Sequence, residues 1–425
     1  MQDKKQSLVP ELRFPGFEGD WEVKSLGEIG STYAGLSGKS KEDFVNGNAQ
    51  YITFLNVLNN VVIDNTNHPT VKIKENENQN DVKYGDLLFN TSSETPEEVG
   101  FCAMMQDNKP NIYLNSFCFG YRFNVLKDYQ PLFLAYYFRS SYGRRLMTKL
   151  AQGVTRYNLS KSNFLKAEIA FPSLPEQQKI AECLSSVDNL IQAEADQLQA
   201  LKDHKKGLMQ QLFPQEGKTT PKLRFPGFKG EWEEKKLGDI SERVSVGLAT
   251  SVTPYYRDKG VVMFRNLNIK PDELDDSDIL FLDEDFANMN QSKKIHTGDV
   301  LTVHTGYVGI SCVVPAKYDG ALTFTTLVTT TKRHIINPRF LCCFLNSSEG
   351  ANAIESLQAG GGRNNLNVND FVLLRVPIPP TIDEQLKIVD CLSSLNDHIF
   401  AESAKVEALR EHKKGLMQKL FPTIN

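Results

Sequence analysis

A chain of 425 residues is long enough for two or three domains that each bury a core of their own. Its hydrophobic fraction of 40% and charged fraction of 24% are those of an ordinary globular protein, and its longest apolar runs are too short to span a membrane. The net charge of −4 argues against a protein that coats nucleic acid through bulk positive charge.

The cysteines and the amino-terminal residues bear on the cellular compartment. Seven cysteines, an odd number without a Cys-x-x-Cys pair, indicate reduced and partly buried thiols. Residues 1–6 lead into no apolar stretch of the kind that directs secretion. We therefore expect a cytoplasmic protein.

The opening segment recurs later in the chain, so an internal repeat is the main signal of the sequence. Leu-Arg-Phe-Pro-Gly-Phe at 12–17, followed by Trp21, returns at 223–228 with Trp232, at an offset of 211. Between Leu12 and Ile29, 13 of 18 positions are identical to the second copy.

A second block is repeated at an offset of 208. From Glu176 to Pro214, 23 of 39 positions are identical to Glu384–Pro422. The stretches between the blocks are of similar length but diverge. The sequence therefore predicts two copies of one unit, in which a divergent domain precedes a nearly constant segment.

Each divergent domain is expected to be mixed α/β, with a modest twisted sheet. The predicted helices each begin near a proline and end before glycine, at Leu132–Leu150 and Arg339–Leu357. The predicted strands are rich in β-branched and aromatic residues. They are Gln50–Val57, Asp86–Asn90, Ser116–Phe123, Val261–Asn266, Val300–His304 and Leu322–Thr331.

A polar, glycine-rich loop precedes each constant segment. Glycine permits close backbone approach, arginine can bind phosphate or guanine, and asparagine can read adenine. A flexible connector is the plain alternative. The matching Arg and Asn favour contact with DNA at Thr155, Arg156, Tyr157 and Asn158 in the first copy, and at Arg363, Asn364 and Asn365 in the second.

Further candidates for DNA contact follow predicted strands. Taken singly, each of these residue types is more often a satisfied surface or turn residue. They are Thr91, Ser92 and Ser93 in the first domain, and Tyr256, Arg257, Arg265, Asn266, His304, Thr305 and Tyr307 in the second. His304 has no His or Cys companion at metal-ligand spacing, so no metal site is expected.

The constant segments are predicted to be long helices. Ser173 with Glu176, and Thr381 with Glu384, fit a capping box, and Pro214 and Pro422 stop the two helices alike. Nearly forty residues give a helix about 55–60 Å long. Apolar residues at heptad spacing form the predicted seam of a coiled coil. The seam is Ile180, Leu184, Val187, Ile191, Leu198, Leu201 and Leu208, then Ile388, Leu392, Leu395, Ile399, Val406, Leu409 and Leu416.

Each helix needs a partner, because its apolar stripe is too narrow to support it alone. We favour antiparallel pairing of the two helices over parallel pairing with another chain. Gly207 and Gly415 each lower helix propensity by about 1 kcal/mol, so we expect something to approach the helix backbone closely there. The adjacent Lys-Lys pairs are read as solvated faces or partner contacts rather than DNA contacts.

Three sets of motifs typical of DNA enzymes are missing. Pro379-Pro380 is not followed by the aromatic residue of an adenine methyltransferase loop. Pro271-Asp272 is not followed in its own domain by the acidic-x-Lys of a Mg²⁺ nuclease, and there is no Walker A loop. We expect no catalytic, cofactor-binding or metal-binding residue in this chain.

These features together resemble one family, the specificity subunit (HsdS) of type I restriction-modification systems. The resemblance rests on Pro172–Gln177 and Pro380–Gln385, each leading into a long helix, and on the repeated opening segment. It implies target-recognition domains at 1–172 and 215–379, and spacer helices at 173–214 and 380–425. Each domain is then expected to read one half of an asymmetric bipartite DNA site.

The resemblance also implies the partners. Two modification (methyltransferase) subunits dock on the helices and restriction (translocase/nuclease) subunits join them, bringing S-adenosylmethionine, ATP and Mg²⁺. Two other readings remain open: a self-sufficient DNA-modifying enzyme with atypical motifs, and a coiled-coil scaffold.

Overall fold

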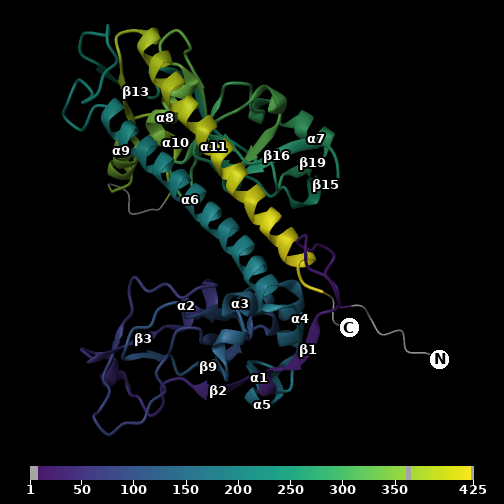
Figure 1. The fold of residues 1–425 in the computed structure, drawn as a ribbon. Helices are drawn as coiled ribbons and strands as arrows, with labels where there is room; N and C mark the ends of the chain where they lie inside the picture. Colours follow the sequence, from purple (N-terminus) through teal and green to yellow (C-terminus); the bar gives the residue numbers. More distant parts are fainter. Residues whose placement is uncertain (1–7, 360–364, 423–425) are drawn as a thin grey trace. The chain divides into compact units, whose positions relative to one another are not determined.

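The computed structural model describes residues 8–359 and 365–422. The chain divides into two compact units, Met1–Ala195 with Ala404–Asn425, and Asp196–Ser403. Each unit thus contains one globular domain, a part of one long helix and a part of the other, and each is described by itself (Figure 1).

The first unit is built on an antiparallel four-stranded sheet of order β2-β9-β5-β7. A three-stranded sheet β4-β3-β8 and the pair β1-β12 accompany it. The elements are β1 (Glu22–Ser25), α1 (Leu26–Ile29), β2 (Gly30–Ala34), β3 (Ala49–Ile52), α2 (Phe54–Asn59), β4 (Thr70–Val71), β5 (Leu87–Asn90), β6 (Ser92–Ser93), β7 (Cys102–Met104), β8 (Ile112–Leu114), β9 (Cys118–Phe123), α3 (Pro131–Arg139), α4 (Ser141–Leu150), β10 (Ala151–Gln152), β11 (Tyr157–Leu159), α5 (Lys161–Leu165), β12 (Glu168–Phe171) and α6 (Leu174–Leu212).

The second unit repeats this plan. Its sheet of order β14-β23-β20-β21 corresponds to β2-β9-β5-β7, and β13 pairs with β24 as β1 pairs with β12. A second four-stranded sheet, of order β15-β19-β16-β22, accompanies them. Its elements are β13 (Glu233–Lys236), β14 (Ser241–Val246), β15 (Tyr256–Arg257), β16 (Val261–Arg265), β17 (Ile269–Lys270), β18 (Glu273–Leu274), β19 (Leu280–Leu282), α7 (Glu284–Met289), β20 (Val300–Val303), β21 (Ser311–Val313), β22 (Leu322–Phe324), β23 (Thr326–Thr331), α8 (Pro338–Leu345), α9 (Ser348–Ala359), α10 (Val368–Phe371), β24 (Arg375–Ile378) and α11 (Ile382–Lys419).

Each core takes residues from the start of one long helix and from the end of the other. In the first unit, Leu184 of α6 and Phe421, just after α11, are buried in the core that holds Phe133. In the second unit, Leu392 of α11 and Phe213, just after α6, are buried in the core that holds Trp232. The mixed α/β fold and the antiparallel pairing of the two helices are therefore as predicted.

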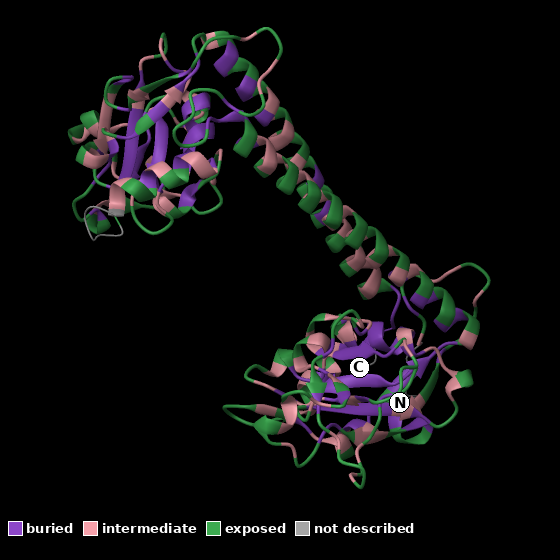
Figure 2. Cartoon of the chain, turned by 90° about the vertical axis from the view of Figure 1, so that its left-hand side faces the viewer, coloured by how far each residue is buried: buried purple, intermediate pink, exposed green. Residues whose placement is uncertain are grey.

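Burial along the helices follows the apolar stripe, and Figure 2 shows both helices largely exposed on their outer faces. Of the predicted seam residues, five are buried and nine are half-buried. The buried ones are Ile180, Leu184, Ile388, Leu392 and Val406.

The predicted capping boxes are wrong in their acidic half. Glu176 accepts hydrogen bonds from the Arg13 guanidinium at 2.8 Å on both oxygens, and Glu384 accepts them from Arg224 at 2.7 and 2.8 Å. A bidentate guanidinium binds a carboxylate more strongly than a single amide does, so it takes both oxygens. Thr381 keeps its half of the box, accepting from the Glu384 amide at 3.3 Å.

Each predicted helix of the globular domains is in fact two helices. Leu132–Leu150 breaks at Ser140, which is extended and caps α4 by accepting from the Gly143 amide. Arg339–Leu357 breaks at Ser347 in the same way, with Gly350. The Ser-x-x-Gly pattern is a local cap that competes with continuation of the helix.

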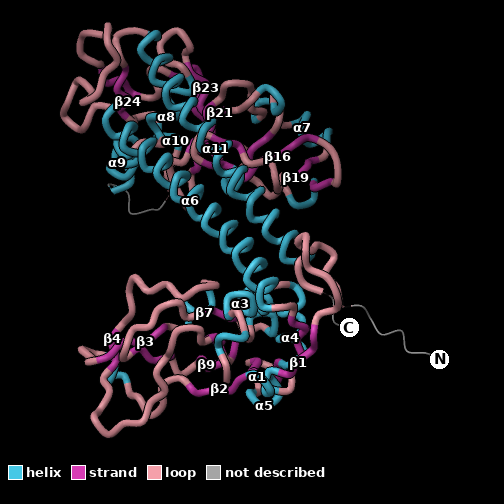
Figure 3. Tube along the Cα trace, in the orientation of Figure 1, coloured by secondary structure: helices cyan, strands magenta, loops and turns pink. Residues whose placement is uncertain are grey.

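Two predicted strands also differ from the structure (Figure 3). Gln50–Val57 is strand only to Ile52, because Thr53 caps helix α2 by accepting from the Asn56 amide. Leu322–Thr331 is two strands in two sheets, since Thr325 adopts a left-handed conformation with φ of 49°.

Candidate functional site

In the first unit, a small sheet joins two candidate segments that lie far apart in sequence. Strand β11 pairs with β6 so that Tyr157 lies opposite Ser93 and Asn158 opposite Ser92. The Leu159 amide donates to the Thr91 carbonyl at 2.9 Å. The structure therefore places the 91–93 and 155–158 candidates on one edge of the domain.

The loop between β10 and β11 is shaped by its glycine. Gly153 has φ of 140°, and a Cβ there would lie 2.1 Å from the Arg156 carbonyl oxygen, so only glycine fits. The loop carries Val154, which is 89% exposed, and the exposed Thr155. The Arg156 Nε donates to Ser92 Oγ at 3.3 Å, which leaves most of its guanidinium available to a ligand.

Phe117 is a member of this group that the sequence analysis missed. Its carbonyl accepts from the Thr91 amide at 2.8 Å, and its ring lies 5.7 Å from the Arg156 guanidinium. The side chain is 55% exposed although it precedes a buried strand. An exposed aromatic ring beside arginine is suited to packing against a base or a sugar.

The second unit brings its own candidates together at the equivalent place. Thr305 forms an isolated antiparallel bridge with Asn365, and the Leu366 amide donates to the His304 carbonyl at 3.0 Å. His304 Nδ1 lies 2.7 Å from the Leu366 carbonyl oxygen, so that nitrogen carries the proton. Tyr307 is 86% exposed at the loop tip. The candidates Arg363 and Asn364 lie outside the described residues.

The remaining candidates of the second unit fall into two groups. Asn266 Oδ1 accepts from Thr326 Oγ1 at 3.1 Å, and Thr326 pairs with Val303, so Asn266 lies beside β20, which ends one residue before His304. Arg265 forms an ion pair with Asp278 at 2.7 Å.

Tyr256 and Arg257 lie on strand β15 instead. Arg257 pairs with Asp283 at 3.1 Å. Within residues 8–359 and 365–422, no hydrogen bond or ion pair joins either residue to His304 or Thr305.

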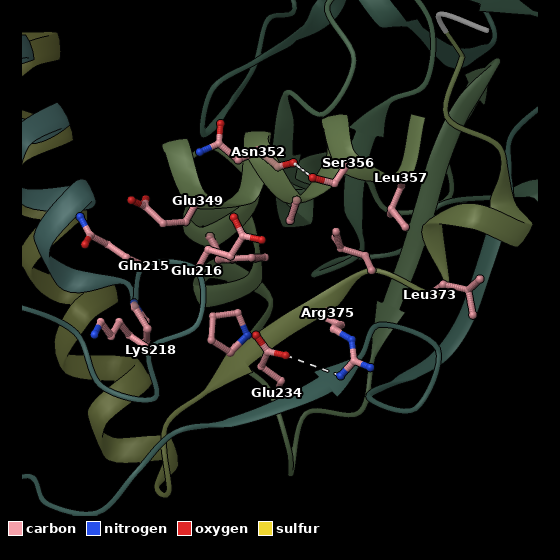
Figure 4. A pocket seen from close by; sticks show the side chains of 15 residues that line it. Gln215, Glu216, Lys218, Glu234, Glu349, Asn352, Ser356, Leu357, Leu373 and Arg375 are labelled. Carbon is pink, nitrogen blue, oxygen red and sulfur yellow. Dashed lines mark hydrogen bonds and ion pairs between the residues drawn. The ribbon is translucent and has the colours of Figure 1, made fainter. Parts of the chain in front are cut away.

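A separate pocket of about 480 Å³ lies in the second unit, between α9, the β13–β24 pair and the residues after α6 (Figure 4). The Glu234–Arg375 ion pair spans its floor at 3.5 Å. None of the predicted site residues lines it.

The side chains of the described segments offer no metal centre, since no group of three or more His, Cys, Asp or Glu that could hold a metal ion occurs among them. None of the helices formed by those residues combines the length and apolarity needed to cross a membrane.

The repeat seen in sequence and structure coincides with two matches to one known family. The type I restriction modification DNA specificity domain matches residues 18–203 and, a second time, residues 229–410. The chain belongs to this family. The predicted resemblance is confirmed, and the two specificity domains correspond to the two copies of the repeat.

Curated relatives agree with the family. The putative type I restriction enzyme MjaX specificity subunit of Methanocaldococcus jannaschii is 26% identical over 436 residues, covering 95% of this chain and 93% of that protein. The MjaVIII specificity subunit of the same organism is 24% identical over 272 residues, covering 62% of this chain and 63% of its own length.

A solved structure shares the fold. The S subunit of a type I restriction-modification system from M. genitalium has a TM-score of 0.59 at 15% identity, covering 98% of this chain and 100% of that one. The specificity-domain fold is therefore shared at very low sequence identity.

Proposed function

We propose that this chain is the sequence-specific DNA-recognition subunit of a type I restriction-modification complex, and that each unit reads one half of a bipartite site. The observation that carries the proposal is a pair of equivalent edges with different side chains. At equivalent positions the first edge has Thr91 and Ser92, and the second has His304 and Thr305. The asparagine opposite them, Asn158 or Asn365, is common to both edges. Different donors and acceptors on one scaffold select different bases, so the site is asymmetric.

Methyl transfer, ATP hydrolysis and cleavage are assigned to partner subunits. Relatives of this chain are named as specificity subunits, which supports a role in recognition rather than catalysis. On this proposal the modification subunits bring S-adenosylmethionine, and the restriction subunits bring ATP and Mg²⁺. The exposed faces of α6 and α11 are the surface on which the modification subunits dock, and the cytoplasm is where the complex works.

Domain exchange tests the recognition role directly. Residues 30–160, from the start of β2 to the residue after β11, are replaced by those of another family member, and methylated positions are mapped genome-wide. We expect one half of the methylated site to change and the other half to stay the same. A change in both halves would contradict independent reading by the two units.

Single substitutions refine that test. Asn158→Ala and Asn365→Ala occupy equivalent places in the two units, so each serves as the control of the other. We expect each to relax selection in its own half-site, with a cost of about 1–3 kcal/mol for the hydrogen bonds that read one base.

Incubating the chain alone with DNA and S-adenosylmethionine tests the competing proposal of a self-sufficient enzyme, which predicts methyl incorporation.

A further inference from the structure

A groove of about 930 Å³ lies within the first unit, between α3–α4 of the globular domain and the long helices. Five cationic side chains line it against one carboxylate, that of Asp188. We call it the basic groove. Its cations are Arg139, Arg144, Arg410, Lys413 and Lys414.

Two of these cations are fixed by the fold without being neutralised. Arg139 donates hydrogen bonds to four backbone carbonyl oxygens and Arg144 to three. Both guanidinium groups lie over the Phe101 ring, at 5.1 and 4.2 Å from its centroid. Neither forms an ion pair with a carboxylate in the described part of the chain. Burial lowers the pKa of each to about 10, so both stay charged at neutral pH.

The other three cations come from α11. Lys413 is half-buried and pairs with Asp188 at 2.5 Å, which cancels its charge. Arg410 and Lys414 have side chains 58% and 65% exposed, and among the described residues their ion-pair partners lie three positions away on the same helix. Such exposed ion pairs contribute little free energy, so both side chains can leave their partners and bind an anion in the groove.

The second unit has a groove at the equivalent place, of about 330 Å³. Its charged lining is Asp272, Glu273 and Asp397 against Arg339, so its sign is opposite. The equivalence is visible at an offset of 208 between the helices. Ser185, Asp188, Asn189 and Gln192 line the basic groove, and Ser393, Asn396, Asp397 and Phe400 line its counterpart.

Opposite charge in equivalent grooves identifies the kind of ligand. A partner protein that docks on both nearly identical helices would meet a basic groove in one unit and an acidic groove in the other. The ligand of the basic groove is therefore not the partner common to both units. The many amide and hydroxyl side chains of its lining, with the cations, are the donors that bind phosphate oxygens.

The basic groove is also continuous with the candidate recognition edge. Arg144 donates to the Gly100 carbonyl, and the Gly100 amide donates to the carbonyl of Asn90. Asn90 ends strand β5, and Thr91 follows it directly. The groove wall and the edge that contains Ser92 thus share one hairpin.

We propose that the basic groove binds the phosphodiester backbone of duplex DNA, away from the bases that are read, and that only the first unit does so. Arg410 and Lys414 contact the phosphates, while Arg139 and Arg144 supply a fixed positive potential. This inference rests on the proposed function and revises the sequence-based expectation that the second lysine of the Lys-Lys pair avoids DNA.

The test compares two matched double variants of the full chain in complex with its modification subunits. Arg410→Gln with Lys414→Gln removes the exposed cations of the groove. Lys202→Gln with Lys206→Gln removes the exposed cations at the repeat-equivalent positions of α6, which do not line the acidic counterpart. Binding to target DNA and to a random duplex is measured over a range of salt concentrations.

We expect the slope of log affinity against log salt to fall by about 0.9 for each phosphate that the protein no longer neutralises, hence by about 2 in the groove variant. Affinity for target and random duplexes should fall by the same factor, leaving their ratio unchanged. The control should keep the wild-type slope, and Arg410→Lys with Lys414→Arg should restore it.

Three results would overturn the inference. The groove variant could keep the wild-type slope. Both double variants could lose assembly with the modification subunits equally, which would assign these cations to the shared partner. Poly-glutamate could compete as strongly as DNA of equal charge, which would indicate an acidic protein segment. A wild-type complex that fails to distinguish target from random DNA would instead contradict the proposed function.

Discussion

Lys205 of helix α6 donates to Asp272 of the globular domain at 2.6 Å. The carboxylate also accepts from Asn346 at 2.9 Å and from Asn396 of α11 at 3.3 Å. Within the second unit, Asp272 therefore ties both long helices to the recognition domain. In the first unit, Lys413 at the equivalent position instead pairs with Asp188 of α6, and Asn396 is the repeat equivalent of Asp188.

Asp272→Asn should destabilise the second unit by about 3 kcal/mol, because both side chains of the Lys205–Asp272 pair are largely buried, at 14% and 12% exposed, and the ammonium loses its counter-charge. Asp188→Asn is the matched control and should cost about 1 kcal/mol or less, since its carboxylate is one-third exposed. The loss of stability in each variant is measured by urea denaturation, monitored by amide hydrogen exchange. Equal losses would show that Asp272 has no special role.

Asp272 should also make the stability of the second unit depend on pH in the acidic range. Burial alone would raise the pKa of Asp272, but the Lys205 charge and the hydrogen bonds from Lys205, Asn346 and Asn396 outweigh it and lower the pKa. A lowered pKa in the folded state contributes stability above about pH 4 that is lost as the pH falls further.

As the pH is lowered from about 6 to about 2, the free energy of unfolding should therefore fall less steeply for Asp272→Asn than for the wild type. Parallel curves for the two proteins would show that the Asp272 carboxylate does not couple folding to protonation.

The ion pairs Arg13–Glu176 and Arg224–Glu384 should stabilise the first turn of each long helix. Glu176 and Glu384 are 2% exposed, so Arg13→Met or Arg224→Met leaves a buried carboxylate unpaired. We expect a loss of about 3 kcal/mol and faster amide exchange in the first turns of α6 or α11. Glu11→Gln breaks the exposed Lys419–Glu11 pair and should have no measurable effect.

Gly207 and Gly415 lie inside the long helices, and a Cβ there would meet nothing within 4 Å in the described chain. Replacing either by alanine should stabilise its helix by about 1 kcal/mol in thermal unfolding. If the modification subunits approach the backbone there, the same variants should bind them more weakly. Unchanged binding of the subunits would show that these glycines mark no docking point.

Lengthening the helix pair should lengthen the gap between the half-sites, provided that both helices are lengthened together. Asp188 pairs with Lys413, and Glu194 with Lys405, so an insertion in α6 alone disrupts the antiparallel register. Four residues added after Ala195 and four before Ala404 keep every pair and lengthen the pair by about 6 Å. Methylation mapping should then show a longer gap between unchanged half-sites.

Much of the fold could be predicted from the sequence because its signals are local or repeated. Heptad spacing, the prolines after Phe213 and Phe421, and the two tryptophans fix the long helices and the two copies. The boundaries of shorter elements could not be predicted in the same way. Ser140, Thr53 and Thr325 end or divide elements through caps and one left-handed residue, against a continuous apolar pattern.

The candidate recognition residues were predicted by chemistry, but their grouping was not. Ser92 and Asn158 are neighbours only because β6 and β11 pair, and Phe117 joins them through a backbone hydrogen bond that leaves no trace in sequence. Arg257, by contrast, has the right chemistry but lies on a different strand, paired with Asp283.

The sequence by itself determined that two divergent domains share one helical frame, because a repeat and a heptad are readable along the chain. Only the tertiary structure decided which charges face each other. Lys205 and Lys413 are identical in sequence, yet one pairs with Asp272 from a recognition domain and the other with Asp188 from a helix. The physical reason is that an ion pair depends on which residues the packing brings within a few ångströms, and no local pattern encodes that distance.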